Sequence, residues 1–500
     1  MRAQSLASAV PASQRSARLS RKARAFVATN GDRLSLVRDP LRLLLFALTV
    51  LTVSQLHQHY PMLMKLRPAL LLVVASTGYA FLNPRYLTRA NVWDVWPMRL
   101  VAFLGILACF SAVFGISLGR TASFIVSVYV KVIVYSFLLA FSIRHVRDLF
   151  TLVWGYVVGC GILAFFSLFM FGIARTNSGF ARLDHLYMYD ANDLGVIMMV
   201  GIPLVMLLLS VSRGSQRWML ISILVAIAAT IARSGSRGGF LGFVAVGIGS
   251  LVLANGVSLS KRIVLIFIAP IALALGAPAG YWKQMGTVMQ PKADYNYSTI
   301  DGRKAVAERG IGYMAKYPIF GLGMNNFSRA ECTISPKLDG LSRTGPIRCT
   351  APHNSYVQAG AELGVAGLIV WVSLEMGLIV VLLRLRRRLP RQWKRGTAAE
   401  RFLYGATTYF PLSMIGFAVT SFFVSFAWME PLYIMAAFTT GLYVSLREHA
   451  RLQNGGHAQA STSRVPEQPE RGWRVARSAS RAQPLVRLGL STESDPCAAS

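Results

Sequence analysis

Long apolar runs, separated by short polar connections, dominate the chain. Many of them extend for roughly 17–25 residues, the length of an α-helix that crosses the hydrocarbon core of a bilayer. The alternating segments of about 10 residues that a membrane β-barrel needs are missing from the sequence. The pattern therefore predicts an all-α, polytopic bundle of about twelve transmembrane helices. We place them near residues 43–60, 66–82, 98–117, 121–142, 149–172, 193–211, 218–232, 239–258, 263–280, 354–383, 402–426 and 431–446.

Composition supports a membrane protein and changes how the charge is interpreted. Hydrophobic residues make up 54% of the 500 residues and charged residues only 15%, whereas soluble proteins carry about 25% charged residues. The net charge of +31 is typical of nucleic-acid binding proteins. Here, however, Lys and Arg are concentrated in the connections and tails, as in the cytoplasmic loops of membrane proteins. We therefore expect the charge to set topology and expect no nucleic-acid partner.

Every second connection between the predicted helices is basic. This alternation indicates on which side of the membrane each connection lies. With the N-terminus inside, every second connection is basic, namely those with Arg85 and Arg89, Arg144 and Arg147, Arg213 and Arg217, Lys261 and Arg262, and the 384–395 run. This threading predicts a basic cytoplasmic tail at 1–42, helices one to nine at 43–280, a large helical outer loop at 281–352, helices ten to twelve at 353–446, and a disordered cytoplasmic tail at 447–500.

Two arginines lie on the outer side, where topology does not require them. Arg233 and Arg237 stand in "ARSGSRGGFLGF", a tight turn rich in small residues that lets a ligand approach the backbone. The planar fork of arginine suits phosphate oxygens. The alternative is that both side chains extend to lipid headgroups. The sequence therefore predicts an anion site or a headgroup contact at this turn.

The predicted outer loop holds a helix that is capped by Ser298, Thr299 or Asp301 and ends at Pro318. Arg303 and Arg309 are about 240° apart around such a helix, so only one of them needs to face a given site. A solvated helix face accounts for Lys304, Glu308 and Arg309. Cys332 and Cys349 also lie in this loop and are disulfide candidates, closing a loop worth about 3 kcal/mol. No Cys/His spacing indicates a metal site.

Polar residues also precede the tenth predicted helix, in "APHNSYVQAGAELGVAGLIVW". Asn354 is placed to cap this helix, with His353 just before it at the water–lipid boundary. Glu362 lies two turns further on and shares a helix face with Ser355 and Gln358. A histidine at such a boundary is either structural or, near arginines and an anionic ligand, a general base.

A further polar segment, "DANDLG" at 190–195, precedes the sixth predicted helix. Asp190, Asn192 and Asp193 are placed to cap its positive end, or to hydrogen-bond a polyol. Tyr187 and Tyr189, just before it, either stack on sugar rings or belong to the interfacial aromatic belt.

These motifs together resemble the O-antigen ligase and O-antigen polymerase superfamily over about residues 173–383. "SRGGFLGF" is similar to the family's arginine turn, with Arg237 in the motif position. Arg303, fifteen residues before "PIFGLG", stands where the family keeps a loop arginine. "HNSYVQAGAELG" is similar to the start of the helix after that loop, with His353, Asn354 and Glu362.

The resemblance implies an inverting glycosyltransferase of the bacterial inner membrane that needs no metal and no cofactor. Its partners are a polyprenyl-diphosphate-linked glycan, a glycan or lipid acceptor, and membrane lipids, and its large loop is periplasmic. It implies a catalytic role for His353 and donor binding by Arg237 and Arg303, with Arg233 second. Asn354 and Glu362 are further candidates for substrate binding. The alternatives are transfer to a protein hydroxyl, a lipid-linked glycan flippase, and a structural part of an export complex.

Overall fold

The computed structural model describes residues 34–88, 91–175, 181–183, 189–253, 277, 281–286, 299–338 and 348–462. The chain forms two units, Met1–Leu452 and Gln453–Ser500, and the residues discussed below belong to the first. The predicted tails, 1–42 and 447–500, fall largely outside the described residues, and so does nearly all of the predicted helix at 263–280.

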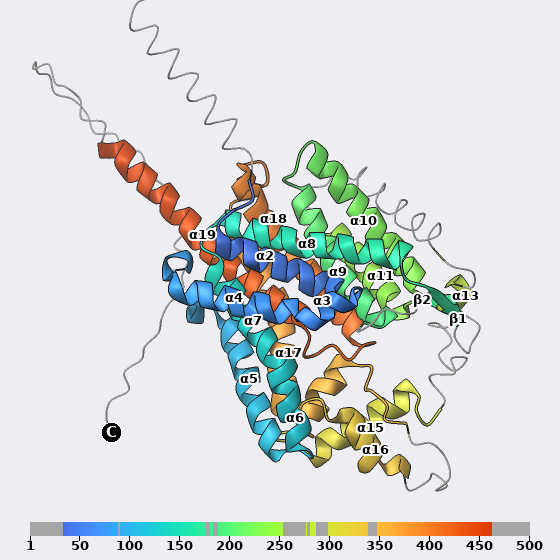
Figure 1. Ribbon diagram of the computed structural model, residues 1–500. Helices are drawn as coiled ribbons and strands as arrows, with labels where there is room; N and C mark the ends of the chain where they lie inside the picture. Colours follow the sequence, from blue (N-terminus) through green and yellow to red (C-terminus); the bar gives the residue numbers. More distant parts are fainter. Residues whose placement is uncertain are drawn as a thin grey trace, which may run out of the picture. The chain divides into compact units, whose positions relative to one another are not determined.

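Helices form almost all of the described secondary structure (Figure 1). They are α2 (Pro40–Ser54), α3 (Pro61–Leu66), α4 (Pro68–Leu82), α5 (Trp96–Phe114), α6 (Leu118–Phe124), α7 (Val130–Ser142), α8 (Val146–Phe169), α9 (Ala191–Leu209), α10 (Ser215–Ser234), α11 (Arg237–Leu253), α13 (Tyr281–Gly286), α15 (Arg303–Lys316), α16 (Phe327–Thr333), α17 (Ser355–Arg388), α18 (Ala398–Ser421) and α19 (Glu430–Thr462). A π-helical segment, Ile125–Tyr129, joins α6 to α7. The strands β1 (Ile173–Arg175) and β2 (Ala181–Leu183) form an antiparallel pair with Ala174 opposite Arg182.

The predicted all-α architecture is confirmed. Among the described residues, eight helical segments are long and apolar enough to cross a membrane. Each helix predicted from the sequence, apart from 263–280, overlaps a helix of the structure. The helix expected at 354–383 is present as α17, but it contains a kink. It is broken at Gly364, which has φ 75° and ψ −174°.

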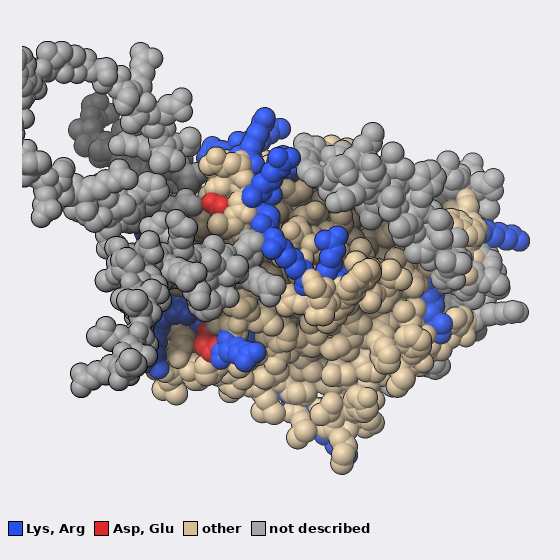
Figure 2. Space-filling view, turned by 90° about the horizontal axis from the view of Figure 1, so that it is seen from above, with Lys and Arg blue, Asp and Glu red and all other residues tan. Residues whose placement is uncertain are grey.

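Burial separates central helices from peripheral ones. In the most apolar 18-residue stretch of α9, 83% is buried inside the protein, whereas in that of the α3–α4 segment only 11% is buried. A helix that is apolar on every side, such as α9, is stable in the centre of a bundle. It packs against α8, α10, α11 and α18. Figure 2 shows one face of the molecule, on which a few basic and acidic side chains interrupt a broad surface without charge, as expected for a surface in contact with lipid.

The described residues 299–338 and 348–352, which we call the cap, pack against the first part of α17. Val306 and Tyr313 of α15 form a small apolar cluster with Phe327 of α16 and with Val357 and Ala361 of α17. The break at Gly364 accommodates this packing, because the amide of Val365 donates a hydrogen bond of 2.7 Å to the carbonyl of Pro318 in the cap. The cap is therefore built onto the helix that follows His353.

Candidate functional site

The turn between α10 and α11 is stiffened by one serine. Ser236 Oγ accepts the amide hydrogen of Gly239 at 3.0 Å and so caps α11, and it donates to Asn192 Oδ1 at 2.8 Å. Backbones also meet here, since a Cβ on Gly195 would lie 3.1 Å from Gly239 Cα. The "DANDLG" and "SRGG" segments, both singled out in the sequence, therefore contact each other. Arg237 is half-buried at the first position of α11.

Arg233 is the second-to-last residue of α10, and its side chain reaches the residues just after the end of α8. Its Nη2 donates to the carbonyl of Phe171 at 3.3 Å. Its Nε is buried and has no hydrogen-bond partner among the described residues. One nitrogen of this guanidinium therefore links α10 to the segment just after α8, whereas the buried Nε–H has no acceptor among the described residues.

Arg303 is the first residue of α15, and its guanidinium carbon lies 6.0 Å from the centroid of the Phe423 ring. That distance suits a cation–π contact. Arg309 points elsewhere, to the Glu331 carboxylate, and the two arginines face different partners as their helical angle predicted. The solvated face expected for Arg309 was wrong, since its side chain is only 11% exposed. The side chains of Lys304 and Glu308 are 54% and 62% exposed and form an ion pair on the surface, as expected.

His353 has the left-handed backbone value φ 47°, which is uncommon for a residue with a side chain. Such conformations cost about 1–3 kcal/mol and persist where the surroundings hold them. Here the amide of His353 donates to Ser425 Oγ at 2.9 Å. Asn354 caps α17 as expected, with its Oδ1 accepting from the amides of Tyr356 at 2.9 Å and Val357 at 3.1 Å.

The polar face after His353 binds the segment between α18 and α19. Ser355 Oγ accepts from the amide of Phe426, and Gln358 Oε1 accepts from the amide of Ala427. Trp428 Nε1 donates to Glu362 Oε2 at 2.6 Å. The three polar side chains therefore share a face, as their spacing predicted.

Glu362 also joins the cap to this face. Its Oε2 accepts from the amide of Asn325 at 2.9 Å and its Oε1 from the amide of Phe327 at 3.2 Å. With the Trp428 indole, the buried carboxylate therefore has three protein donors, and these contacts give Glu362 a structural role.

The short stretch 423–425 links the other candidates. A Cβ built on Gly238, next to Arg237, would lie 2.7 Å from Phe423 Cβ, so the α11 turn contacts this residue closely. Arg303 lies over the ring of the same Phe423, and His353 is bonded to Ser425. Three segments far apart in the sequence thus meet one stretch. Sequence reasoning missed Phe423 and Ser425, because an aromatic residue and a serine in "SFFVSFAWMEP" carry no local sign of a site.

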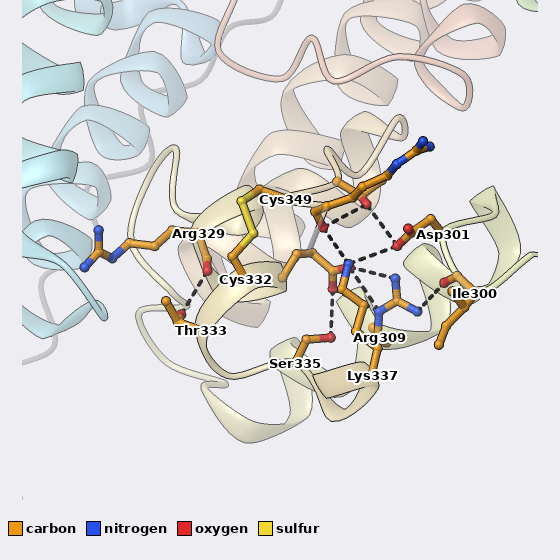
Figure 3. Close-up of polar contacts among 12 residues, drawn as sticks. Ile300, Asp301, Arg309, Arg329, Cys332, Thr333, Ser335, Lys337 and Cys349 are labelled. Atoms are coloured by element: carbon orange, nitrogen blue, oxygen red, sulfur yellow. Dashed lines mark hydrogen bonds and ion pairs between the residues drawn. A yellow bond between two sulfur atoms is a disulfide. The ribbon is translucent and has the colours of Figure 1, made fainter. Parts of the chain in front are cut away.

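Figure 3 shows the polar network that holds the cap together. Arg309 Nε and Nη2 donate to Glu331 at 2.9 and 2.6 Å, and Tyr313 donates to it at 2.8 Å. Burial alone would raise the pKa of the Glu331 carboxyl, but hydrogen bonds from Arg309, Tyr313 and Lys337 outweigh it and hold that pKa below its usual value. A disulfide joins Cys332 and Cys349, with Cα atoms 5.1 Å apart.

Comparison with known proteins assigns these motifs. Residues 222–372 match the profile of a family described as O-antigen ligase. The chain contains an O-antigen ligase domain. This domain includes Arg233, Arg237, Arg303 and His353, and it confirms the resemblance drawn from the sequence. The apolar helices indicate a multi-pass membrane protein, and its residues 222–372 resemble O-antigen ligases.

Two further findings complete the comparison. No curated protein matches the chain. Among the described residues, no group of three or more His, Cys, Asp or Glu side chains is arranged to hold a metal ion. The Phe423–Ser425 stretch follows the matched region, so the O-antigen ligase domain meets a part of the chain outside its own limits.

Proposed function

We propose that this protein transfers a glycan from a polyprenyl diphosphate to an acceptor hydroxyl at the periplasmic face of the bacterial inner membrane. The proposal makes it an O-antigen ligase or a polysaccharide polymerase. The observation that carries it is that the Arg237 turn, Arg303 and His353, all from the O-antigen ligase domain, meet at Phe423–Ser425.

Arg237 and Arg303 bind the diphosphate of the donor. As the bond between the sugar and the phosphate oxygen breaks, the electron pair moves to the leaving polyprenyl diphosphate, and its negative charge grows. Guanidinium groups placed beforehand at that position stabilise the transition state more than the ground state. Arg233 is the second-choice ligand, because part of its guanidinium is bonded to Phe171.

His353 accepts the proton of the acceptor hydroxyl while the hydroxyl oxygen bonds to the anomeric carbon. A positioned general base contributes about 10²–10⁴-fold to a rate. Its left-handed backbone and the hydrogen bond from its amide to Ser425 fix the main chain that carries the imidazole. Direct displacement inverts the anomeric configuration. The proposed reaction uses no metal and no nucleotide sugar.

The test uses full-length protein in detergent with a polyprenyl-diphosphate-linked glycan as donor. Release of polyprenyl diphosphate is common to every acceptor, so it is the readout. Arg237→Ala, Arg303→Ala and His353→Ala should each lower the rate by about 10²-fold or more. The matched control is Lys304→Ala, because Lys304 is beside Arg303 on the same helix and its side chain is 54% exposed. Normal rates in all three site variants would refute the proposal.

The acceptor is resolved by parallel reactions. Lipid A–core, a second lipid-linked glycan and a protein with free hydroxyls are supplied separately. Product on the first identifies a ligase, product on the second a polymerase, and product on the third a protein glycosyltransferase. Because no sealed membrane is present, any product also excludes simple transport as the measured activity.

A further inference from the structure

A buried lysine at the centre of the cap has three acceptors. Lys337 lies in the short helical turn Pro336–Leu338, and its side chain is 2% exposed. Its Nζ donates to Asp301 Oδ1 at 2.9 Å and to the carbonyl of Arg348 at 2.7 Å, and it lies 3.1 Å from Glu331 Oε2. A lysine is rarely buried unless it is paired, and all three ammonium hydrogens have an acceptor here.

Two of these acceptors lie on the chain segments that lead into the site. Asp301 is two residues before Arg303, and Arg348 is five residues before His353. Thr350 strengthens the connection, since its Oγ1 donates to Asp301 Oδ1 at 3.2 Å. A residue spans at most about 3.6 Å of chain, so the Asp301 anchor lies within about 7 Å of Arg303 and the Arg348 anchor within about 18 Å of His353 along the chain.

The cap has other means of staying folded. Arg309 and Tyr313 both bind Glu331 without Lys337. The disulfide joins Cys332 to Cys349, and apolar residues of α15, α16 and α17 pack together. What Lys337 adds is a direct bridge between the segment that enters α15 and the segment that leads to His353 (Figure 3).

We propose that Lys337 is a positioning residue that fixes Arg303 and His353 relative to each other, and this rests on the transferase function proposed above. It touches neither donor nor acceptor. By bridging Asp301 and Arg348, it keeps the diphosphate ligand and the general base in register, so the two act on the same bond. Its removal should affect the chemical step more than donor binding, which Arg237 continues to support.

The test compares Lys337→Met with Lys304→Met, a lysine substitution on the exposed face of α15. Polyprenyl-diphosphate release is measured per folded molecule, well below the melting temperature, with the folded fraction taken from size-exclusion chromatography. For Lys337→Met we expect a kcat about 100-fold lower with an unchanged KM for the donor, since a 1 Å misplacement costs about that much. Lys337→Arg, which keeps the charge and donors, should recover most of the loss, and Lys304→Met should match the wild type.

If folded Lys337→Met has a normal kcat, the inference is wrong. It is also wrong if its activity falls only in proportion to the folded fraction, since that indicates a purely structural lysine. Should Lys337→Met not fold, Asp301→Ala decides, because it removes the acceptor at one end of the bridge and keeps the Lys337–Glu331 contact. A normal kcat in that variant refutes the bridge, and a lowered one supports it. His353→Ala and Arg303→Ala are measured beside them. If both are fully active, the proposed function itself fails, whatever the result at Lys337.

Discussion

Substitution of Gly238 by alanine tests the contact between the arginine turn and the 423–425 stretch. A Cβ at this position would lie 2.7 Å from Phe423 Cβ and 2.9 Å from its Cγ. Carbon atoms pack at about 3.5–4.0 Å, so one of the two segments must move by about 1 Å. Phe423 Cβ is fixed to the main chain, and no side-chain rotation relieves the clash. Overpacking of this kind costs about 1–3 kcal/mol.

The adjacent glycine provides the control. A Cβ on Gly239 would lie 3.4 Å from Ser236 Cβ and Oγ and 3.5 Å from Gly195 Cα, which are ordinary contacts. Both positions are in the first turn of α11, so both alanines change helix propensity by the same small amount. The difference between the two variants therefore isolates the contact with Phe423.

A shift at Phe423 reaches both sides of the proposed site. Arg303 lies over the Phe423 ring, and Ser425, two residues on, holds the amide of His353. Gly238→Ala should lower the rate of polyprenyl diphosphate release by about 100-fold, and Gly239→Ala should stay within about twofold of the wild type. Melting temperatures are measured on both purified proteins. Equal activity in the two variants would show that the contact with Phe423 does not matter for the site.

Two further predictions concern stability. Gly364→Ala should lower the free energy of unfolding by about 2–6 kcal/mol, because its backbone conformation is open only to glycine and its Cβ would lie 2.5 Å from the Pro318 carbonyl oxygen. Gly105→Ala is the control and should not lower it, because a Cβ there would have no atom within 4 Å. Equal melting temperatures of the two variants would contradict this prediction. The pKa values of Glu331 and Asp301 are lowered in the folded cap, so the stability that these carboxylates contribute is fully present above their unfolded pKa values of about 4. This contribution is lost as the pH falls through the folded pKa values. Thermal melts of the wild type and of Glu331→Gln, measured at several acidic pH values, should therefore differ in their pH dependence.

Local patterns in the sequence predicted much of this architecture. Apolar runs located the helices, because each run must bury or face lipid along its own length. Helical angles separated Arg303 from Arg309 and placed Ser355, Gln358 and Glu362 on one face. These are properties of a few neighbouring turns, so they can be read without knowing the rest of the chain.

Features that depend on distant segments were not accessible in the same way. "ELGVAG" fits an unbroken membrane helix, in which glycine is common. The break at Gly364 depends on the 318–323 segment docking beside it, where the amide of Gly323 bonds to the carbonyl of Glu362 at 3.1 Å. The burial of Arg309 likewise depends on Glu331, twenty-two residues away.

The site's dependence on the segment between α18 and α19 follows from how its parts are supplied. Arg237, Arg303 and His353 each stand at the start of a helix or just before one, and nothing in their own segments fixes their separation. Phe423 and Ser425 contact all three segments, and Trp428 binds Glu362 behind them. These residues lie beyond 372, where the O-antigen ligase match ends. The site proposed from the arginines and histidine of the matched domain therefore depends on the segment between α18 and α19.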